Sequence, residues 1–482
     1  MLVFLLVIVG VLALLGGVHW YVWKRLVRDV TVAGGLGRRL GTVAAFVLPV
    51  LSVAALVSGR AGAPFWLQQV VAWPGFLWLA SLLYVTLALV VGEAVRPLLR
   101  RWPARRGTAT VTEAEEAGKA TQPEESEESE ESEESARTAV RAGGPVVAAG
   151  GGAAVPVGDT LTEPEAEPVP ALQAEPALKD GPARGNGPAP AVTEAGAEAS
   201  RTPGATAVSR RLFVSRVVGG AAAAAAVGTV GYGTYGVLRG PRVKRVTVPL
   251  AKVPRAAHGY RIAVVSDIHL GPILGRAHTQ RIVDAINATQ PDLIAVVGDL
   301  VDGTVENLGP AAEPLARLRA RHGSFFVTGN HEYFSGADAW VDHVRELGLR
   351  PLRNERLEIA AGFDLAGVDD IAGESEGQGP DFAAALGDRD RAKAAVLLAH
   401  QPIVVHDAVR HGVDLQLSGH THGGQLWPGN YLAELANPTV AGLERYGDTQ
   451  LYVSRGAGAW GPPVRVGAPS DITLVELASK QA

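Results

Sequence analysis

Three long apolar runs near the start of the chain constrain its fold more than any other feature. They cover residues 2–23, 41–58 and about 70–92. Each has roughly the length that an α-helix needs to cross ~30 Å of hydrocarbon. We therefore predict that residues 1–106 form a membrane region with three transmembrane helices. A removable signal peptide is disfavoured for the first run, because it lacks a basic start and two further runs follow.

The basic residues of this region are unevenly distributed. Residues 1–106 contain 11 basic and 2 acidic side chains, and the loop between the second and third runs has only Arg60. The other basic residues cluster after the first run and after the third: Lys24, Arg25, Arg28, Arg38, Arg39, Arg96, Arg100, Arg101, Arg105 and Arg106. Because positive loops tend to stay in the cytoplasm, we predict a cytoplasmic first loop, a cytoplasmic segment after residue 96 and an external N-terminus.

The composition changes sharply over residues 107–208. This segment has 6 basic and 19 acidic side chains, a fourfold Glu-Glu-Ser repeat at 124–135, and few large apolar residues. Such a segment buries too little apolar surface to offset the entropy of folding. We predict an acidic, Ala/Pro/Glu-rich disordered linker that acts as a solvated spacer, with a docking tail as the alternative.

A fourth apolar stretch, at 217–238, follows the sequence Ser209-Arg210-Arg211-Leu212-Phe213. Residues 209–240 thus resemble a twin-arginine signal, which implies the twin-arginine export machinery as a partner; a fourth transmembrane helix is the alternative. Both interpretations predict a multi-pass protein of the cell membrane in which the residues after 240 are extracytoplasmic. A second basic cluster favours a cytoplasmic position for these residues: Arg239, Arg242, Lys244 and Arg245.

From residue 243 onward, short apolar strands alternate with amphipathic helices. The predicted strands are 260–266, 293–297, 324–328, 394–399 and 413–418, and the predicted helices are 277–289, 310–320, 337–347 and 402–411. This alternation predicts a layered α/β domain over residues 243–482. Residues that follow such strands gather at one edge of a sheet, where ligands usually bind in open α/β folds.

Polar side chains follow all five predicted strands. The motifs are Asp267-Ile268-His269, Gly298-Asp299-Leu300-Val301-Asp302, Gly329-Asn330-His331-Glu332, His400 and Gly419-His420-Thr421-His422. Each motif alone is a weak signal, since turn aspartates and solvated histidines are common. Their joint occurrence after five apolar strands indicates one polar rim. The chain has no cysteine, so nitrogen and oxygen atoms must hold any metal there.

Residues ~255–482 resemble the calcineurin-like metallophosphoesterases. The resemblance lies in the order of five motifs: D-x-H, G-D-x-x-D, G-N-H-E, H and G-H-x-H. The later sequences Gly423-Gly424-Gln425 and Gly456-Ala457-Gly458 are similar to the membrane-associated bacterial branch of that superfamily. The resemblance covers slightly less than half of the chain. It implies a layered β-sandwich-type domain flanked by helices, and it says nothing about the membrane region or the linker.

The resemblance also implies two divalent metal ions, each held by its own set of ligands. Asp267, His269 and His422 would hold one ion, and Asn330, His400 and His420 would hold the other, with Asp299 as the bridge. Manganese, iron, zinc and cobalt all accept such ligands. Two cations would acidify a water, so that hydroxide attacks phosphorus in line while the charge on the phosphate oxygens is neutralised.

Three further side chains have implied or open roles. His331 matches the family's histidine that is not a ligand, and we assign it catalytic protonation of the leaving alkoxide. Asp302 either orients His331 or a ligand, or caps the following turn. Glu332 is interpreted as structural. Six other histidines are expected on the surface or in helices: His258, His278, His322, His343, His406 and His411.

The predicted function is a membrane-tethered, metal-dependent phosphoesterase. Its substrate would be a phosphate mono- or diester or a diphosphate, and the tether favours a lipid-linked or envelope substrate. The sequence of the α/β domain has no stripe of basic residues that would indicate nucleic acid binding. The main alternative is a catalytically inactive, membrane-anchored binding or scaffold protein with the same fold. A transporter is disfavoured, because the apolar runs contain no Asp, Glu, Lys or Arg, and Glu93 lies only at the end of the third run.

Overall fold

The computed structural model describes residues 2–101 and 210–481. The predicted acidic linker, residues 107–208, lies outside the described residues. Three long helices lie in the predicted membrane region: α1 (Leu2–Trp23), which a short π-helix (Lys24–Arg28) extends, α2 (Leu36–Val57) and α3 (Phe65–Arg101). A fourth, α4 (Arg210–Leu238), covers the apolar stretch that precedes the α/β domain. Within the described residues, three stretches are long and apolar enough to cross a membrane: Leu36–Val57, Phe65–Leu99 and Arg211–Leu238.

Helix α4 packs closely against α3. Ala80 and Leu89 of α3 share a buried cluster with Ala222 and Val230 of α4. A Cβ atom at Gly92 of α3 would lie only 2.5 Å from Val218 of α4, so this glycine permits a close helix–helix approach. The fourth apolar stretch is therefore an integral member of the helical bundle.

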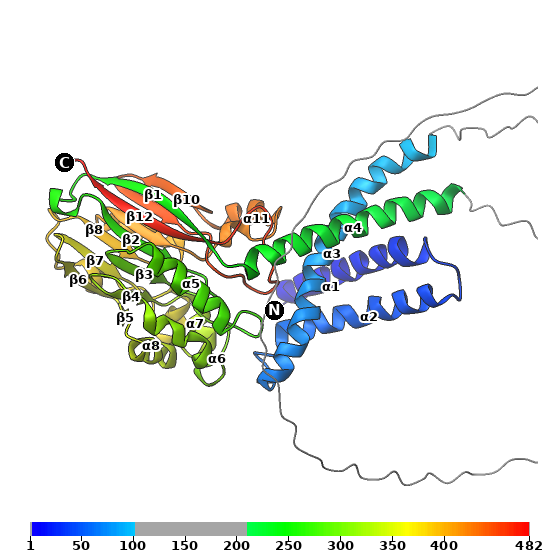
Figure 1. Ribbon diagram of the computed structural model, residues 1–482, viewed down its shortest axis with the longest axis horizontal. Helices are drawn as coiled ribbons and strands as arrows, with labels where there is room; N and C mark the ends of the chain where they lie inside the picture. Colours follow the sequence, from blue (N-terminus) through cyan, green and yellow to red (C-terminus); the bar gives the residue numbers. More distant parts are fainter. Residues whose placement is uncertain (1, 102–209, 482) are drawn as a thin grey trace, which may run out of the picture. The chain divides into compact units, whose positions relative to one another are not determined.

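The domain after α4 is built on two six-stranded sheets (Figure 1). The first sheet has the order β1-β12-β2-β3-β4-β5 and the second has the order β10-β11-β9-β8-β7-β6. The strands of the first sheet are β1 (Arg242–Leu250), β12 (Asp471–Ser479), β2 (Tyr260–Val265), β3 (Leu293–Val297), β4 (Ser324–Val327) and β5 (Arg350–Pro351). Those of the second are β10 (Gly442–Tyr446), β11 (Thr449–Val453), β9 (Leu415–Ser418), β8 (Ala395–Leu398), β7 (Phe363–Gly367) and β6 (Glu355–Ile359).

The central strands of both sheets run parallel. In the first sheet β2, β3, β4 and β5 pair in parallel, and in the second sheet β7, β8, β9 and β11 do the same. Antiparallel pairs occur where β12 meets β2, where β6 meets β7 and where β10 meets β11. Because parallel strands end at the same edge of a sheet, the loops after β2, β3 and β4 emerge together, as do those after β8 and β9.

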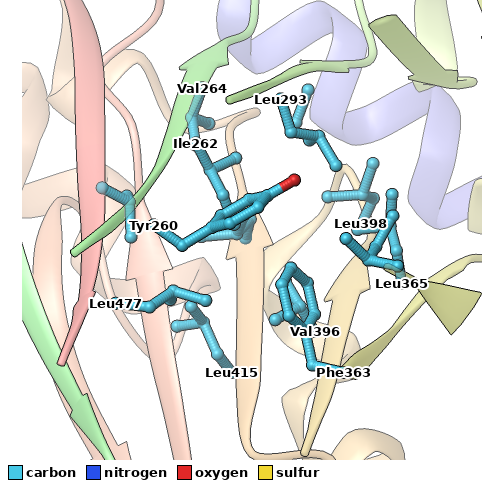
Figure 2. Packing of buried hydrophobic residues seen from close by; sticks show 14 of the residues in the cluster. Tyr260, Ile262, Val264, Leu293, Phe363, Leu365, Val396, Leu398, Leu415 and Leu477 are labelled. Atoms are coloured by element: carbon cyan, nitrogen blue, oxygen red, sulfur yellow. The ribbon is translucent and has the colours of Figure 1, made fainter. Parts of the chain in front are cut away.

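The main hydrophobic core lies between the two sheets (Figure 2). Ile262 and Val264 of β2 point into it toward Val396 and Leu398 of β8, whereas Ala263 and Val265 contribute to a second cluster on the outer face. This alternation follows from the two-residue period of a strand, and it explains why the strands are apolar on both faces. The predicted layered β-sandwich-type domain with flanking helices is confirmed.

Helices cover the outer faces of the sandwich. Ile282 of α5 and Trp340 of α8 pack against the first sheet, and Phe382 of α9 and Ala408 of α10 pack against the second. The helices of the domain are α5 (Arg276–Ala288), α6 (Val305–Ala312), α7 (Asn330–Ser335), α8 (Ala337–Glu346), α9 (Phe382–Leu386), α10 (Val405–Arg410) and α11 (Gly429–Ala436). Short 3-10 helices cover Arg255–Ala257, Glu313–Arg317, Ile371–Glu376, Pro402–Val404 and His422–Gly424.

The helix predicted at 310–320 has different bounds. Helix α6 begins earlier and ends at Ala312, and a 3-10 helix then covers Glu313–Arg317. Pro314 lies in its first turn, and because proline lacks an N–H group it interrupts the α-helical hydrogen-bond pattern there.

Three residues of the second basic cluster belong to β1 and not to a membrane flank. Arg242, Lys244 and Arg245 are exposed on this edge strand, which pairs only with β12 within the sheet. Charged side chains on an edge strand discourage pairing with other chains. This placement gives the three residues a role in the fold.

Candidate metal centre

The polar motifs of the sequence meet at the carboxyl ends of the parallel strands. Asp267 and His269 follow β2, Asp299 and Asp302 follow β3, Asn330 and His331 begin α7 after β4, His400 follows β8, and His420 and His422 follow β9. The first sheet thus supplies all three carboxylates and the second sheet supplies three of the imidazoles. All of these side chains are buried or half-buried.

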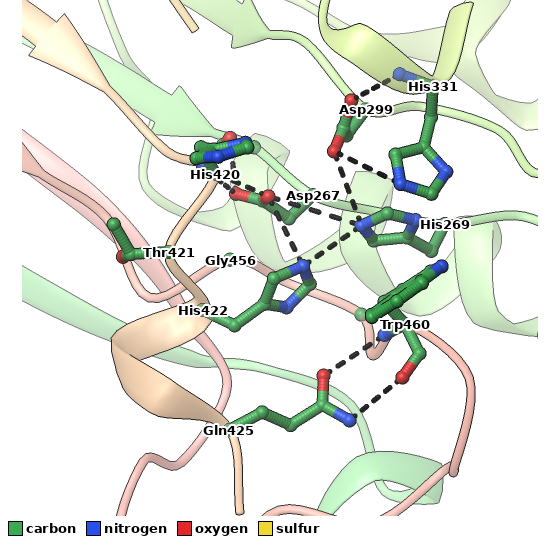
Figure 3. A network of polar contacts seen from close by, with 12 residues as sticks. Asp267, His269, Asp299, His331, His420, Thr421, His422, Gln425, Gly456 and Trp460 are labelled. Carbon is green, nitrogen blue, oxygen red and sulfur yellow. Dashed lines mark hydrogen bonds and ion pairs between the residues drawn. The ribbon is translucent and has the colours of Figure 1, made fainter. Parts of the chain in front are cut away.

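One group of potential ligands surrounds Asp267. The ligand atoms of Asp267, His269 and His422 all lie within 4.8 Å of one another. The two imidazoles face each other with 3.0 Å between their Nε2 atoms, and His422 Nε2 lies 3.4 Å from Asp267 Oδ1 (Figure 3). Two ring nitrogens directed at one point beside a carboxylate oxygen form an arrangement that a single cation can occupy.

A second group surrounds Asp299. Its atoms and those of His400 and His420 also lie within 4.8 Å of one another. His400 Nε2 is 3.1 Å from Asp299 Oδ2, and Asn330 Oδ1 is 2.9 Å from His420 Nδ1. The amide of Asn330 therefore joins this group as a neutral oxygen donor.

Asp299 connects the two groups. Its Oδ2 atom lies 3.1 Å from His400 Nε2 in one group and 3.7 Å from His269 Nε2 in the other. Its Oδ1 atom accepts a hydrogen bond from the backbone N–H of His331 at 2.9 Å, which fixes the orientation of the carboxylate. A carboxylate held between two sets of ligands has the position of a bridge.

His331 belongs to neither of these two groups, but its ligand atom also lies within 4.8 Å of those of His269 and Asp299. Its Nδ1 atom is 2.6 Å from Asp302 Oδ1, and its Nε2 atom is 4.0 Å from Asp299 Oδ2. Phe334 and Trp460 contact the ring edge to face, with centroid distances of 5.6 Å and 5.8 Å. The ring is thus held by one carboxylate and two aromatic side chains.

Charge within this buried cluster is balanced between carboxylates and imidazoles. Burial alone would lower the pKa of His269, but the carboxylates of Asp302, Asp299 and Asp267 raise it to about 9. Burial would raise the pKa of Asp299, but His400 above all holds it well below its ordinary value. Without a cation, protonated imidazoles therefore compensate the carboxylates.

Two imidazoles have the opposite shift. Burial, together with His400, lowers the pKa of His420 to about 4. Burial, His269 and Arg465 hold the pKa of His422 well below its ordinary value. Both rings are neutral near pH 7, which is the form that binds a metal ion.

The residues fit a pair of divalent cations. His400 Nε2 is buried and has no hydrogen-bond partner of acceptable geometry, although Asp299 Oδ2 lies 3.1 Å away. Its other nitrogen, Nδ1, lies 2.9 Å from the carbonyl oxygen of Val297, and a hydrogen bond donated there would make Nε2 the atom that binds a metal ion. Imidazole, carboxylate and amide donors suit manganese, iron, zinc or cobalt.

Backbone strain is concentrated in the same residues. Five of the seven predicted ligands have a left-handed backbone: Asp267 (φ 53°), His269 (φ 49°), Asp299 (φ 52°), His420 (φ 71°) and His422 (φ 52°). This conformation costs a non-glycine residue ~1–2 kcal/mol. Such strain persists only where the surrounding structure enforces it, and it typically clusters at functional sites.

Asp302 and Glu332 are now assigned contacts that the sequence left open. Asp302 Oδ1 lies 3.0 Å from His269 Nδ1 as well as 2.6 Å from His331 Nδ1, so it orients both rings. The carboxylate of Glu332 accepts backbone hydrogen bonds from Gly329, Asp299 and Leu300 at 2.6, 2.9 and 2.7 Å. Glu332 is thereby a structural link between the loops after β3 and β4.

Sequence reasoning missed several residues that support the site. Arg465 is buried, and its Nη2 atom lies 2.9 Å from His422 Nδ1. Gln425 donates to the carbonyl oxygens of Trp460 and Pro462 and accepts from the Trp460 N–H, each at 3.0 Å. The glycines around 425 and 456–461 signalled these segments, but nothing in the sequence indicated that they contact each other.

Gly458 shows why this segment requires a glycine. Its N–H donates to the carbonyl oxygen of Asp267 at 2.8 Å, so the two backbones are adjacent. A Cβ atom at Gly458 would lie 1.9 Å from the carbonyl oxygen of Ile268, which no side chain can tolerate. The glycine therefore allows the segment to support the loop that carries Asp267 and His269.

Comparison with known proteins identifies the family. A family model described as calcineurin-like phosphoesterase matches residues 260–424. An uncharacterized metallophosphoesterase of Aquifex aeolicus is 36% identical over 243 residues, which make up 50% of this chain and 92% of that protein. The chain belongs to the calcineurin-like metallophosphoesterase family.

This metallophosphoesterase has both bacterial and animal relatives. A Helicobacter pylori metallophosphoesterase, also named uncharacterized, is 38% identical over 251 residues, covering 52% of this chain and 67% of the relative. A Danio rerio protein named transmembrane protein with metallophosphoesterase domain is 39% identical over 264 residues, covering 52% of this chain and 60% of the relative. The chain thus spans about three fifths of the length of that relative. The predicted bacterial branch is consistent with the bacterial matches.

Among solved structures, the metallophosphoesterase overlaps a dimetal phosphatase from Danio rerio. The sequence identity is 11%, the TM-score is 0.30, and the overlap covers 45% of this chain and 91% of that one. A score this low supports no functional comparison. The Danio rerio relative is named a transmembrane protein, and this chain has helices long and apolar enough to cross a membrane. Together these observations support association with a membrane.

Proposed function

We propose that this protein is a membrane-tethered, metal-dependent hydrolase of phosphate monoesters, phosphodiesters or diphosphates. The observation that carries the proposal is the position of Asp299 between two buried groups of ligands, with His331 beside them. In this assignment Asp267, His269 and His422 would hold one divalent cation. Asn330, His400 and His420 would hold the other, and the Asp299 carboxylate would be shared between the two groups.

Bound cations would supply Lewis-acid charge for the phosphate oxygens and a more acidic water as the nucleophile. The remaining work falls to side chains of the chain itself. Asp302 holds Nδ1 of His331, so that the Nε2 side of the ring is available to the substrate. From there His331 donates a proton to the leaving oxygen, a step worth ~10²–10⁴ in rate. Phe334 and Trp460 restrict the ring to this orientation.

We further propose that the catalytic domain lies on the extracytoplasmic side of the cell membrane. The basic residues after α1 and after residue 96 favour a cytoplasmic position for those segments. Helix α4 then starts in the cytoplasm and leads directly into β1 outside. Because α4 packs into the helical bundle, this topology needs a fourth transmembrane helix and no recognition by the twin-arginine machinery.

The decisive test combines metal analysis with activity on the purified full-length protein. A panel of a phosphomonoester, a phosphodiester and a lipid diphosphate would be offered with each of the four metals. We expect Asp299→Asn to lose metal, and His331→Ala to keep metal while turnover falls at least a hundredfold. The exposed His406 on α10 provides the control, and His406→Ala should change neither property.

Two results would contradict the proposal. If the wild-type protein binds metal but hydrolyses no member of the panel, the protein is an inactive binding or scaffold protein with a phosphoesterase fold. If His331→Ala retains full turnover, the proton donor is another group. Labelling of an introduced surface cysteine in the catalytic domain of intact cells tests the topology, since only an extracytoplasmic position is accessible to an impermeant reagent.

A further inference from the structure

The cavity beside His331 is bounded partly by the membrane region. Its volume is about 360 Å³, and it is lined by His269, Asp302 and His331. The end of α2, the first part of α3 and the connection between them also line it. A cavity of this size accommodates a drug-sized molecule. A phosphoester that reaches His331 therefore also lies against the helices of the membrane region.

Residues of α2, α3 and the connection between them form one wall of the cavity, and specific contacts join this wall to the catalytic domain. Phe65, the first residue of α3, packs against the buried cluster that contains Ile268, next to the ligand loop after β2. A Cβ atom at Gly461 would lie 3.7 Å from the ring of Phe76. The guanidinium carbon of Arg60 lies 5.8 Å from the centroid of Phe334, whose ring in turn contacts His331.

The wall is apolar where it extends along the helices. Leu56 of α2 and both Phe76 and Leu79 of α3 line the cavity. The side chain of Leu56 is 43% exposed, so the described residues leave it partly uncovered. Leu79 follows Phe65 by 14 residues in α3, a rise of about 21 Å. The cavity thus connects the metal-ligand residues with the stretch of α3 that is apolar enough to cross a membrane.

The side chain of Arg60 places one positive charge at the polar end of this wall. Arg60 is exposed and lines the cavity, and it has no ion pair within residues 2–101 and 210–481. It is also the only charged residue between α2 and α3. An arginine guanidinium binds phosphate and carboxylate oxygens through paired hydrogen bonds. The cavity therefore offers a charged end for a polar headgroup and an apolar side for a hydrocarbon.

From this arrangement we infer that the substrate is a phosphoester with a long hydrocarbon chain that lies against α2 and α3. This inference rests on the proposed function. The phosphoryl group meets His331, and the polar part of the headgroup meets Arg60. In the reaction a water oxygen forms a new bond to phosphorus and the P–O bond to the leaving group breaks. The leaving oxygen keeps the electron pair and takes a proton from His331, and a proton of the water is released.

The test uses a series of 4-nitrophenyl phosphodiesters whose second ester carries a methyl, octyl or hexadecyl chain. The full-length protein would be assayed in detergent with its metal. Burying a methylene in an apolar site changes an equilibrium by about fourfold. We expect the octyl ester to exceed the methyl ester at least tenfold in kcat/KM. Leu56→Trp, which fills the cavity, should reduce that preference to less than threefold.

A matched control separates the cavity from partitioning into micelles. Val91 is an exposed residue of α3 that does not line the cavity, and Val91→Trp should retain the preference for long chains. Equal kcat/KM for all three esters would overturn the inference and leave the proposed function intact. A preference that survives Leu56→Trp would also overturn it, because partitioning would then explain the effect.

A binding measurement distinguishes failure of the inference from failure of the proposed function. If neither these esters nor any member of the panel above is hydrolysed, the proposed function fails, and calorimetry with methyl and hexadecyl phosphonate then tests the cavity alone. Tighter binding of the hexadecyl compound, lost in Leu56→Trp, supports the hydrocarbon site, and equal binding overturns it. Vesicles with phosphatidic acid or a polyprenyl phosphate distinguish the two sources of the chain, and release of phosphate from neither lipid contradicts the inference.

Discussion

Replacing Asp302 with asparagine tests whether one carboxylate orients both a metal ligand and the proton donor. Asp302 Oδ1 lies 3.0 Å from His269 Nδ1 and 2.6 Å from His331 Nδ1. Asparagine keeps an oxygen at the same position but removes the negative charge. The pKa of Asp302 is lowered to about 2, because the two imidazoles outweigh the opposing effect of burial, so the wild-type residue is ionised at any working pH.

The magnitude follows from the change in hydrogen-bond type. A charge-assisted hydrogen bond is worth about 1.5–3 kcal/mol, roughly twice a neutral one. Asp302→Asn should therefore cost about 1 kcal/mol at each ring. We expect a loss of about five- to tenfold in metal affinity through His269. At saturating metal we expect a similar loss in kcat through His331.

The loss of metal affinity should depend on pH. The carboxylate of Asp302 contributes to raising the pKa of His269 to about 9, so in the wild type a proton must leave this ring before metal binds at pH 7. Asp302→Asn lowers that pKa and weakens the competition from protons. The deficit in affinity should be largest above pH 9 and should shrink toward pH 7.

Metal titration at pH 7 and pH 9.5, combined with kcat at saturating metal, measures both parts. The control is Asp342→Asn, which changes an exposed carboxylate on α8 that pairs with Arg345. The reasoning is refuted if Asp302→Asn leaves kcat at saturating metal unchanged and if its affinity for metal matches the wild type at both pH values.

Three further predictions test the supports of the site. Glu332→Gln should lower the free energy of unfolding by about 2–4 kcal/mol, because the amide NH₂ would face buried N–H donors; thermal melting in detergent measures this, and an unchanged midpoint would contradict it. Metal binding at pH 7 should release protons, since the pKa of His269 is about 9, and affinity should fall as the pH drops; calorimetric heats that are identical in buffers of different ionisation enthalpy would rule this out. Gly458→Ala should abolish metal binding or folding because its Cβ would lie 1.9 Å from the Ile268 carbonyl oxygen, whereas Gly275→Ala, with nothing within 4 Å, should be neutral; metal content of both variants decides.

Much of the site's neighbourhood was predictable because parallel strands have a strong sequence signal. Residues 293–297 were predicted as a strand with the bounds that β3 has, and the polar motifs follow such strands directly. Because those strands end at the same edge, the joint occurrence of the motifs was enough to place Asp267, Asp299 and Asn330 near one another. Their assignment as metal ligands stays a prediction.

The remaining features depend on contacts that a local pattern does not encode. The strand β1 shows no alternation strong enough to distinguish it from a basic membrane flank, and its pairing with β12 joins residues far apart in sequence. Arg465 reaches His422 from a segment with no motif of its own. The left-handed backbone of His420 is equally invisible in the sequence, since it results from the packing of neighbouring loops and not from residue type.

The central position of β12 in the first sheet has a consequence for biosynthesis. This strand, Asp471–Ser479, lies between β1 and β2, which the ribosome produces more than two hundred residues earlier. Until it emerges, β1 has no neighbour and β2 has one open edge, while α4 can already be inserted in the bilayer. The first sheet therefore cannot be completed until the last strand has been synthesised. Chaperones that protect open sheet edges should matter more for this protein than for one whose strands pair in the order of synthesis.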